Sequence, residues 1–398
     1  DFIHTQNFIT KGITDMNKHN TLLGQLLSFV SRPRFENLVK ITQADKHCKG
    51  FTAWQQFVTM SYAQLANPNG LRSLENSLNS NHTSLYHLGI HKNLKRSTIS
   101  YANNNRSCEL FEKLFYCILE TLNPCERNKF RKDFYAVDAT EISLNMHDFS
   151  WAEFRSTKSG VKVNMKYDIN NSVPSYLFIT NAKEHENNTL KDMKLKKGDT
   201  VAFDKGYCNY QVFGDFCREK ILFVTRLKEN ALYEVIEDRE TGSKLITLDQ
   251  TIRFTGAQTG KRCPFPLRII KSTDEKTGNE ITILTNIFDR SAAYVARLYR
   301  ARWNIEIFFK TIKQNLRIKK FYGETENAVK TQIWIALIIY LLYLKLRQMS
   351  KNAVKNFTHF ICEVSVCIFQ RKDLFEWFAG SPPVKVSVVS YLQPELGL

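Results

Sequence analysis

Apolar and polar positions follow two different periods along the chain, and the change of period divides it near residue 131. Before that point, apolar residues recur every three to four positions, as in amphipathic helices, with Asn- and Ser-rich turns between them. After it, runs such as 134–140 and 161–169 alternate with a period of two, as strands do. Strand and helix patterns then alternate from 200 to 225, which predicts a mixed α/β sheet flanked by helices.

The remaining stretches complete the expected domain organisation. Two Thr-Gly turns separate short β-like runs between 226 and 288, which predicts a β-rich insertion in the α/β domain. The stretch 291–320 predicts one long helix with a charged face, and 327–349 predicts a buried helix. We therefore expect a helical domain at 1–130, an α/β domain at 131–349 and a C-terminal tail at 350–398.

The charge of the chain narrows the class of partner. Lys and Arg number 56 against 39 Asp and Glu, which gives a net charge of +17 and an isoelectric point near 9.4. Such an excess favours a polyanionic partner, most often nucleic acid. The short helices before 131 carry Lys92, Lys95, Arg96 and Arg106 between polar turns. This pattern of short basic helices and polar turns fits both a helix-turn-helix-like DNA-binding domain and a plain helical bundle.

Composition argues against two other kinds of site. The nine cysteines are scattered, with no Cys-x-x-Cys pair, which disfavours a zinc site and fits reduced thiols. No secretory signal is visible at the start, and the most apolar stretch, 333–344, is shorter than a bilayer-spanning helix. We therefore expect a cytoplasmic protein with no membrane partner.

Three acidic residues occupy positions from which a sheet could build a metal site. Asp138 lies within a predicted strand, Asp204 ends the apolar run 200–203, and Glu306 lies on the predicted helix 291–320. An ionised carboxylate in a sheet is costly unless it is paired or bound to a metal. Three such groups on a rigid scaffold are able to hold two Mg²⁺ ions about 4 Å apart, one activating the attacking oxygen of a phosphodiester reaction and one stabilising the leaving oxygen.

The helix that carries Glu306 also presents cations. Offsets of 3, 4 and 7 separate four residues that fall within an arc of roughly 60° on an ideal helix, namely Tyr299, Arg302, Glu306 and Lys313. This combination suggests that a phosphodiester is held where a metal is bound, whereas a solvated charged face is the alternative interpretation of the helix alone. Trp303 fits either a core position or a stacking role on DNA.

The acidic residues and the charged helix resemble the DDE transposases of bacterial insertion sequences, whose catalytic domain is ribonuclease H-like. The signature of the YREK group in that family, Tyr-x2-Arg-x3-Glu-x6-Lys, matches the spacing of Tyr299, Arg302, Glu306 and Lys313. The segment 204–207, Asp-Lys-Gly-Tyr, and the position of Asp138 agree with the same family. The resemblance covers about 131–349.

The resemblance implies a reaction and a role for each residue. Asp138, Asp204 and Glu306 would be the catalytic residues and would bind two Mg²⁺ ions, which Mn²⁺ could replace. Arg302 and Lys313 would hold DNA phosphates near the cut end, assisted by Tyr299. The implied reaction is cleavage at insertion-sequence ends and strand transfer into target DNA, by cut and paste through a hairpin. The implied partners are the terminal inverted repeats, the target DNA and a second copy of the chain, in the nucleoid of a bacterium.

Two points stay open in the sequence. The family's β insertion supplies an aromatic residue that stacks on a flipped base, but no tryptophan lies between Trp151 and Trp303, which leaves Tyr233, Phe254 or Phe265. A simple ribonuclease H-like nuclease or resolvase would keep the three carboxylates without the cations beside Glu306. A non-catalytic DNA-binding remnant is the other alternative, and the presence of all three acids argues against it.

Overall fold

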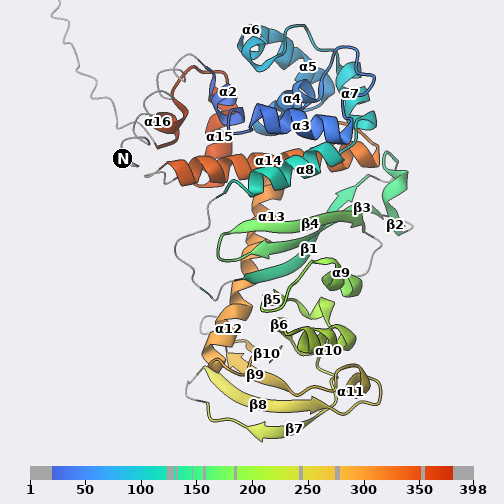
Figure 1. Cartoon of the computed structure of the whole chain (residues 1–398), viewed down its shortest axis with the longest axis vertical. Helices are drawn as coiled ribbons and strands as arrows, with labels where there is room; N and C mark the ends of the chain where they lie inside the picture. The colour runs from blue at the N-terminus through green and yellow to red at the C-terminus, as the bar shows by residue number, and fades with distance from the viewer. Residues whose placement is uncertain are drawn as a thin grey trace, which may run out of the picture.

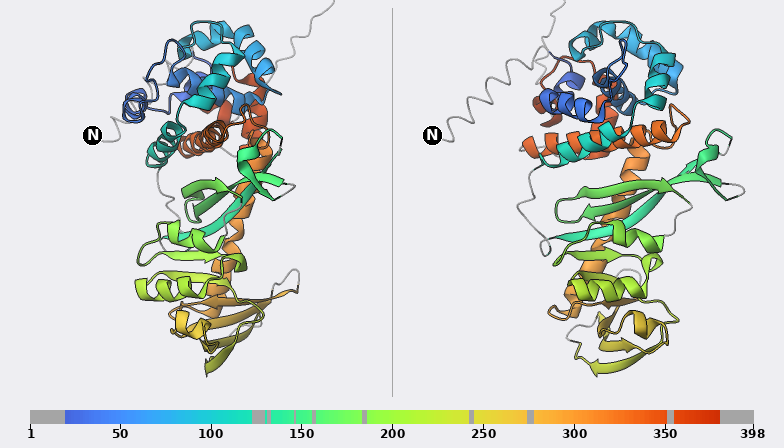
Figure 2. Two further views of the ribbon diagram at one scale, coloured as in Figure 1. Left: turned by 90° about the vertical axis from the view of Figure 1, so that its right-hand side faces the viewer. Right: turned by 45° about the vertical axis from the view of Figure 1, so that its right-hand side comes forward.

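The computed structural model describes residues 20–379, except 123–129, 131–132, 146, 156–157, 183–185, 242–244, 274–277 and 351–354. Helices from both ends of the chain gather at one end of an elongated molecule, and the β-strands with the helices packed beside them make up the rest (Figures 1 and 2). A long helix, α14 (Glu326–Met349), lies between the helical end and the sheet.

The N-terminal part is helical, as expected. Its elements are α2 (Leu22–Leu27), α3 (Arg32–Thr42), α4 (Ala53–Ala66), α5 (Leu71–Ser80), α6 (His82–Leu85), η1 (Tyr86–Leu88), α7 (Arg96–Asn105) and α8 (Glu109–Leu119). Local sequence explains where they begin. Pro33 lies in the first turn of α3, and Thr52 forms a capping box with Gln55 at the start of α4.

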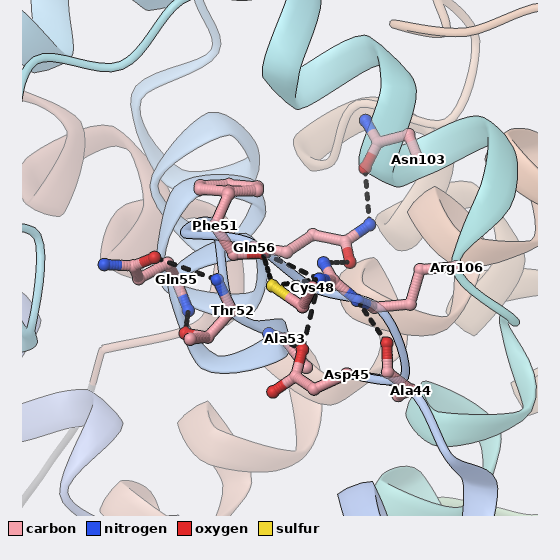
Figure 3. A network of polar contacts seen from close by, with 10 residues as sticks. All are labelled: Ala44, Asp45, Cys48, Phe51, Thr52, Ala53, Gln55, Gln56, Asn103 and Arg106. Atoms are coloured by element: carbon pink, nitrogen blue, oxygen red, sulfur yellow. Dashed lines mark hydrogen bonds and ion pairs between the residues drawn. The ribbon is translucent and has the colours of Figure 1, made fainter.

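Arg106 fastens the connection between α3 and α4 to the end of α7 (Figure 3). Its guanidinium donates to the carbonyl oxygens of Ala44 at 2.8 Å and Phe51 at 2.7 Å. It also pairs with Asp45 at 3.1 Å and donates to the side chain of Gln56 at 2.7 Å. This buried network gives the irregular connection a fixed shape, because its backbone carbonyls are satisfied by one rigid donor group.

The sheet is mixed. Within the described residues its strands run in the order β2-β3-β1-β5-β6-β10-β9-β8-β7, with β4 paired to β3. β1, β5 and β6 are parallel, and the other pairs are antiparallel. The bounds are β1 (Phe134–Leu144), β2 (Glu153–Arg155), β3 (Lys158–Asp168), β4 (Val173–Asn181), β5 (Thr200–Phe203), β6 (Leu222–Arg226), β7 (Tyr233–Asp238), β8 (Ile246–Phe254), β9 (Leu267–Thr273) and β10 (Glu280–Thr285). The prediction of a mixed α/β sheet flanked by helices, consistent with a ribonuclease H-like domain, is confirmed.

Helices cover both faces of the central strands. Val201 and Phe203 of β5 pack in one apolar cluster with Phe213 of α10 (Tyr210–Glu219). Ala202, which points to the opposite face, packs in the cluster that contains α13 (Trp303–Asn315) and α14. The sheet therefore has two buried faces, as an α/β domain requires. The shorter elements on this part of the chain are η2 (Ser150–Ala152), α9 (Glu186–Asp192), η3 (Lys205–Tyr207) and α11 (Thr259–Arg262).

The stretch 226–288 is β-rich, as expected, and it extends the sheet, because β10 pairs with β6 and carries β9, β8 and β7 outward. One expectation about the second half of the chain needs correction. The stretch 291–320 is not one helix. It forms α12 (Ala292–Ala301) and α13, which meet at Arg302, and α13 ends at Asn315.

The apolar helix α14 is longer than its most apolar stretch suggested. It has 24 residues and is long and apolar enough to cross a membrane, but 89% of its apolar window is buried inside the protein. Beyond it, α15 (Phe357–Cys367) and α16 (Leu374–Ala379) lie in the stretch expected as a tail. The backbone of Leu22 bonds to Gln370, so these helices join the N-terminal ones.

Candidate active site

Strand register brings Asp138 and Asp204 together. The last paired residues of the parallel strands β1 and β5 are Val137 and Phe203, and each acidic residue follows one of them. Neighbouring strands lie about 4.8 Å apart, and side chains alternate between faces. Asp138 and Asp204 therefore stand side by side and point to the face that α12 and α13 cover.

Arg302 links Asp138 to Glu306. At the junction of α12 and α13 its guanidinium lies 2.8 Å from the Glu306 carboxylate and 3.5 Å from that of Asp138. The Arg302 side chain is only 9% exposed. Burial opposes its positive charge, but Tyr299, Glu306 and Asp138 outweigh that effect, so the pKa of the guanidinium lies above its ordinary value. Arg302 is thus a permanent cation enclosed between two of the candidate carboxylates.

Tyr299 links the third carboxylate to the same helix junction. Its hydroxyl donates to Asp204 at 3.4 Å, and its ring lies 5.8 Å from the guanidinium carbon of Arg302. Burial chiefly raises the pKa of Tyr299 to about 12, so the hydroxyl keeps its proton and acts as a donor near neutral pH. Asp204, Tyr299 and Arg302 therefore form one continuous polar group under α12 and α13.

An open groove runs from the carboxylates along α13. It has a volume of about 450 Å³ and is lined in part by Asp138, Glu306 and Lys313. The ammonium of Lys313 donates to the backbone carbonyl of Glu141 in β1 at 2.8 Å. Burial, together with Lys319, holds the pKa of Lys313 below its ordinary value, while Glu141 opposes the shift. The groove combines two carboxylates with cations, as a phosphodiester site needs.

The structure arranges the six residues singled out from the sequence in two parts. Asp138, Glu306 and Lys313 line the groove, and Arg302 contacts the first two of them. Asp204 and Tyr299 contact each other and are not among the described residues that line it. The expected single helix is wrong, because α12 ends at Ala301 and α13 begins at Trp303. Tyr299 lies before this junction and Glu306 and Lys313 lie after it, while Arg302 at the junction contacts both Tyr299 and Glu306.

Sequence analysis missed other residues of the groove. Lys310, Gln314 and Lys319 line it beside Glu306 and Lys313. Lys310 and Gln314 follow Glu306 by four and eight positions, so helical spacing alone was a signal that could have found them. Trp303 was compatible with a core position, but it is 57% exposed, and Ile307 one turn later is 52% exposed. An apolar pair on the surface of α13 therefore flanks Glu306.

The donor set suits a hard divalent cation. Asp138, Asp204 and Glu306 offer carboxylate oxygens, which Mg²⁺ and Mn²⁺ prefer. Asp138 and Asp204 follow adjacent strands, and Glu306 contacts the same guanidinium, that of Arg302, as Asp138 does. In the part of the chain that the structure describes, no three His, Cys, Asp or Glu side chains are close enough to hold one ion together. The chemistry of the residues fits a metal. In this structure Arg302 contacts the carboxylates of Asp138 and Glu306, and Tyr299 contacts that of Asp204.

Comparisons with known proteins identify relatives of this chain. Residues 129–342 match the family model of the transposase DDE domain, and residues 18–91 match a domain of unknown function (DUF4372). A chain of Sinorhizobium fredii named as the transposase y4zB is 31% identical over 292 residues, which cover 72% of this chain and 80% of the relative. A chain of Geobacillus stearothermophilus named as a transposase for the insertion sequence element IS5377 is 25% identical over 294 residues, which cover 71% and 75%.

A third relative is also named as a transposase. A chain of Synechocystis named as a transposase for the insertion sequence element IS4SA is 24% identical over 266 residues, which cover 65% of this chain and 73% of the relative. The match to the DDE domain spans more than half of the chain and contains every residue of the candidate site. Domains of this kind use divalent metal ions, which the three carboxylates suit. The chain therefore belongs to the DDE transposase family and is an enzyme of the polynucleotidyl transferase and endonuclease type that acts on DNA.

Proposed function

We propose that this transposase cuts DNA at the ends of an insertion sequence and joins the freed ends to target DNA. The observation that carries the proposal is the polar group around Arg302. Its guanidinium contacts Asp138 and Glu306, and its neighbour Tyr299 contacts Asp204. These contacts bring residues from two strands and two helices to one place, as a shared catalytic role requires.

In this proposal Asp138, Asp204 and Glu306 are the catalytic carboxylates. Two Mg²⁺ ions, replaceable by Mn²⁺, would supply activation of the attacking oxygen and stabilisation of the leaving oxygen when bound there. Arg302 and Lys313 hold the phosphates beside the cut, where two cations offset the charge that develops in the transition state. Tyr299 orients Asp204 through its hydroxyl. The spacing of these residues supports membership of the YREK group.

The proposed sequence of bond changes is balanced at each step. Water attacks the phosphodiester at the transposon end, and the 3′-hydroxyl of that strand leaves. This hydroxyl attacks a phosphodiester of the opposite strand and closes a hairpin, and the 3′-hydroxyl of the flanking DNA leaves. A second water attacks the hairpin phosphodiester, and the transposon 3′-hydroxyl leaves again. The 3′-hydroxyl then attacks a target phosphodiester, and a target 3′-hydroxyl leaves. Each step is an exchange of oxygens on phosphorus, so one set of residues serves all of them.

We also propose that the N-terminal helices bind the transposon ends. Residues 20–106 contain ten Lys and Arg against three Asp and Glu. A groove of about 580 Å³ opens on this part of the chain, lined in part by Arg32, Trp54, Tyr86 and His91. Arg32 stacks on Trp54 at 3.9 Å, and Tyr86 is 54% exposed. A cation beside one half-buried and one exposed aromatic ring suits a phosphate and a base of DNA.

The remaining parts of the proposal concern assembly. Two transposon ends must be cut in concert, so we propose a homodimer in the synaptic complex, acting in the bacterial cytoplasm at the nucleoid with no membrane partner. The base-stacking residue of the β-rich stretch would be Tyr233, which is 37% exposed on β7, or Phe265. Phe254 is unsuited to that role because it is only 3% exposed and packs against Tyr210.

Cleavage of a duplex that carries the inverted repeat flanking the reading frame tests the proposal. The purified chain should cut this duplex with Mg²⁺ or Mn²⁺ and should lose activity in EDTA. Asp204→Ala should abolish cutting while leaving DNA affinity largely intact, because the carboxylate serves the metal and does not hold DNA. Full activity of Asp204→Ala would overturn the proposal.

A further inference from the structure

Arg302 occupies the carboxylates that the proposed function assigns to metal ions. Its two terminal nitrogens reach Glu306 at 2.8 Å and Asp138 at 3.5 Å, and its side chain is 9% exposed. The third carboxylate, Asp204, accepts a hydrogen bond from Tyr299. In this arrangement every one of the three carboxylates has a protein partner, and no three of the described acidic, His or Cys residues form a metal cluster.

A guanidinium in this position opposes metal binding in two ways. It uses carboxylate lone pairs that an ion would need for coordination at about 2.0–2.1 Å. It also leaves a full positive charge a few ångströms from the place of a divalent cation, in a partly buried setting where water screens the repulsion poorly. Arg302 and a metal ion therefore compete for Asp138 and Glu306.

The bonding of Arg302 is incomplete where it now lies. Its buried Nε has no hydrogen-bond partner among the described residues. An unmet donor in a buried site is costly, so this Nε is a donor that a further acceptor could satisfy. The neighbouring groove, with Lys310 and Lys313 in its lining, is the place that attracts a DNA phosphate. A phosphate offers a guanidinium two parallel charge-assisted hydrogen bonds.

We propose that Arg302 acts as an internal counter-cation that keeps the metal affinity of the DNA-free enzyme low and transfers to a DNA phosphate when a transposon end binds. Asp138 and Glu306 then become available to the ions. Metal loading is thereby coupled to DNA binding, and the catalytic carboxylates do not take up their ions until a DNA phosphate has bound to Arg302. The inference rests on the proposed function, because it requires that these carboxylates bind metal.

The coupling is tested first by Mn²⁺ binding to the full chain without DNA, followed by electron paramagnetic resonance of the free ion. Arg302→Gln should bind Mn²⁺ about tenfold more tightly than the wild type, which lies within the usual range of coupling between two sites. Arg302→Lys keeps a cation and should bind weakly, as the wild type does. The matched control is Arg300→Gln, which removes an exposed charge two residues away and should change little.

A second measurement uses the wild type alone and needs no variant to fold. Fluorescence anisotropy gives the affinity for a pre-cut end duplex with and without Mn²⁺, and linkage requires the ion to tighten DNA binding by the factor with which DNA tightens ion binding. We expect about a tenfold effect in the wild type and little in Arg302→Gln.

The outcomes separate this inference from the proposed function. Equal or weaker Mn²⁺ affinity in Arg302→Gln, or no effect of Mn²⁺ on DNA affinity in the wild type, would overturn the counter-cation role while leaving the carboxylates as metal ligands. If Asp204→Ala bound Mn²⁺ as the wild type does, both with and without DNA, the proposed function would instead be overturned.

Discussion

The hydroxyl of Tyr299 donates a hydrogen bond to the carboxylate of Asp204, 95 positions earlier in the chain, at 3.4 Å. Tyr299 lies at the end of α12, and Asp204 follows β5, so this contact joins the helix to the sheet at the candidate active site. Substitutions at Tyr299 and at Asp204 can therefore distinguish the effect of orienting the carboxylate from the effect of removing it.

Tyr299→Phe should lower the rate of end cleavage by up to about tenfold, because one hydrogen bond of this kind contributes about 0.5–1.5 kcal/mol. Asp204→Asn, which retains the shape of the side chain, should reduce cleavage below detection. Both rates come from gel assays on the same end-bearing duplex. If Tyr299→Phe were as inactive as Asp204→Asn, the hydroxyl would have a role beyond orienting the carboxylate.

Lys313→Ala should impair cleavage of transposon ends more than nicking of random duplex. The ammonium of Lys313 lies at the groove, where it would fix the end of a strand, and only end processing needs that fixation. The comparison is between end-bearing and random duplexes cut by the same preparation. Lys261→Ala on the distant α11 is the matched control. Equal losses on both substrates would favour a plain ribonuclease H-like nuclease.

The pH dependence of DNA binding should also depend on Lys313. Burial lowers the pKa of this lysine, so it loses its proton at a lower pH than an ordinary lysine, and its attraction for phosphate disappears as pH rises toward 10.5. An arginine at this position stays charged. Affinities measured by anisotropy from pH 7.5 to 10 should therefore fall for the wild type relative to Lys313→Arg. Parallel curves would contradict this assignment.

DNA affinity should fall steeply between about 50 and 200 mM salt, since each neutralised phosphate releases counterions. Arg32→Ala should weaken end binding and reduce the salt slope by about one, as expected for one lost phosphate contact. Tyr86→Ala should weaken binding by about 1–3 kcal/mol with no change of slope, because stacking is not electrostatic. A full retention of affinity in both variants would remove the N-terminal groove from the DNA-binding surface.

Asp249→Ala should destabilise the chain by about 3–5 kcal/mol, because it leaves a buried arginine without its counter-charge. Asp249 forms two hydrogen bonds with Arg268, at 2.7 and 2.6 Å, and both side chains are about 5% exposed or less. Glu234→Ala, which removes an exposed partner of Arg253 on the same sheet, should cost little. Urea unfolding of the three proteins measures the difference, and similar midpoints would refute the prediction.

The side-by-side position of the two aspartates was predictable, because alternation along a strand indicates the face to which each side chain points. Asp138 and Asp204 follow apolar runs that pair in register, so their proximity needed only the assumption that the two strands are neighbours. The pairing of β10 with β6 was beyond such an assumption. It joins residues about 60 positions apart, and nothing in the local pattern names a partner strand.

The break at Arg302 also escaped prediction, for a different reason. The residue keeps helical backbone angles, and no Gly or Pro marks the site. What changes is hydrogen bonding, since the backbone of Arg302 bonds to Tyr299 and that of Ile305 bonds to Arg302, each three residues apart. Tertiary packing sets such a local tightening, so helical periodicity continued through it. The surface position of Trp303 was obscured in the same way.

The outward growth of the sheet from β6 has a consequence for how members of this family diverge. Asp204 lies before β6, and Glu306 lies after β10, so the edge strand β7 can gain or lose length while the two acids keep their places. Interval length between the second and third acid is therefore a poor guide to relatedness. Homologues that differ here by dozens of residues are expected to share one superposable catalytic geometry, and this edge is the natural position for a fused reporter domain.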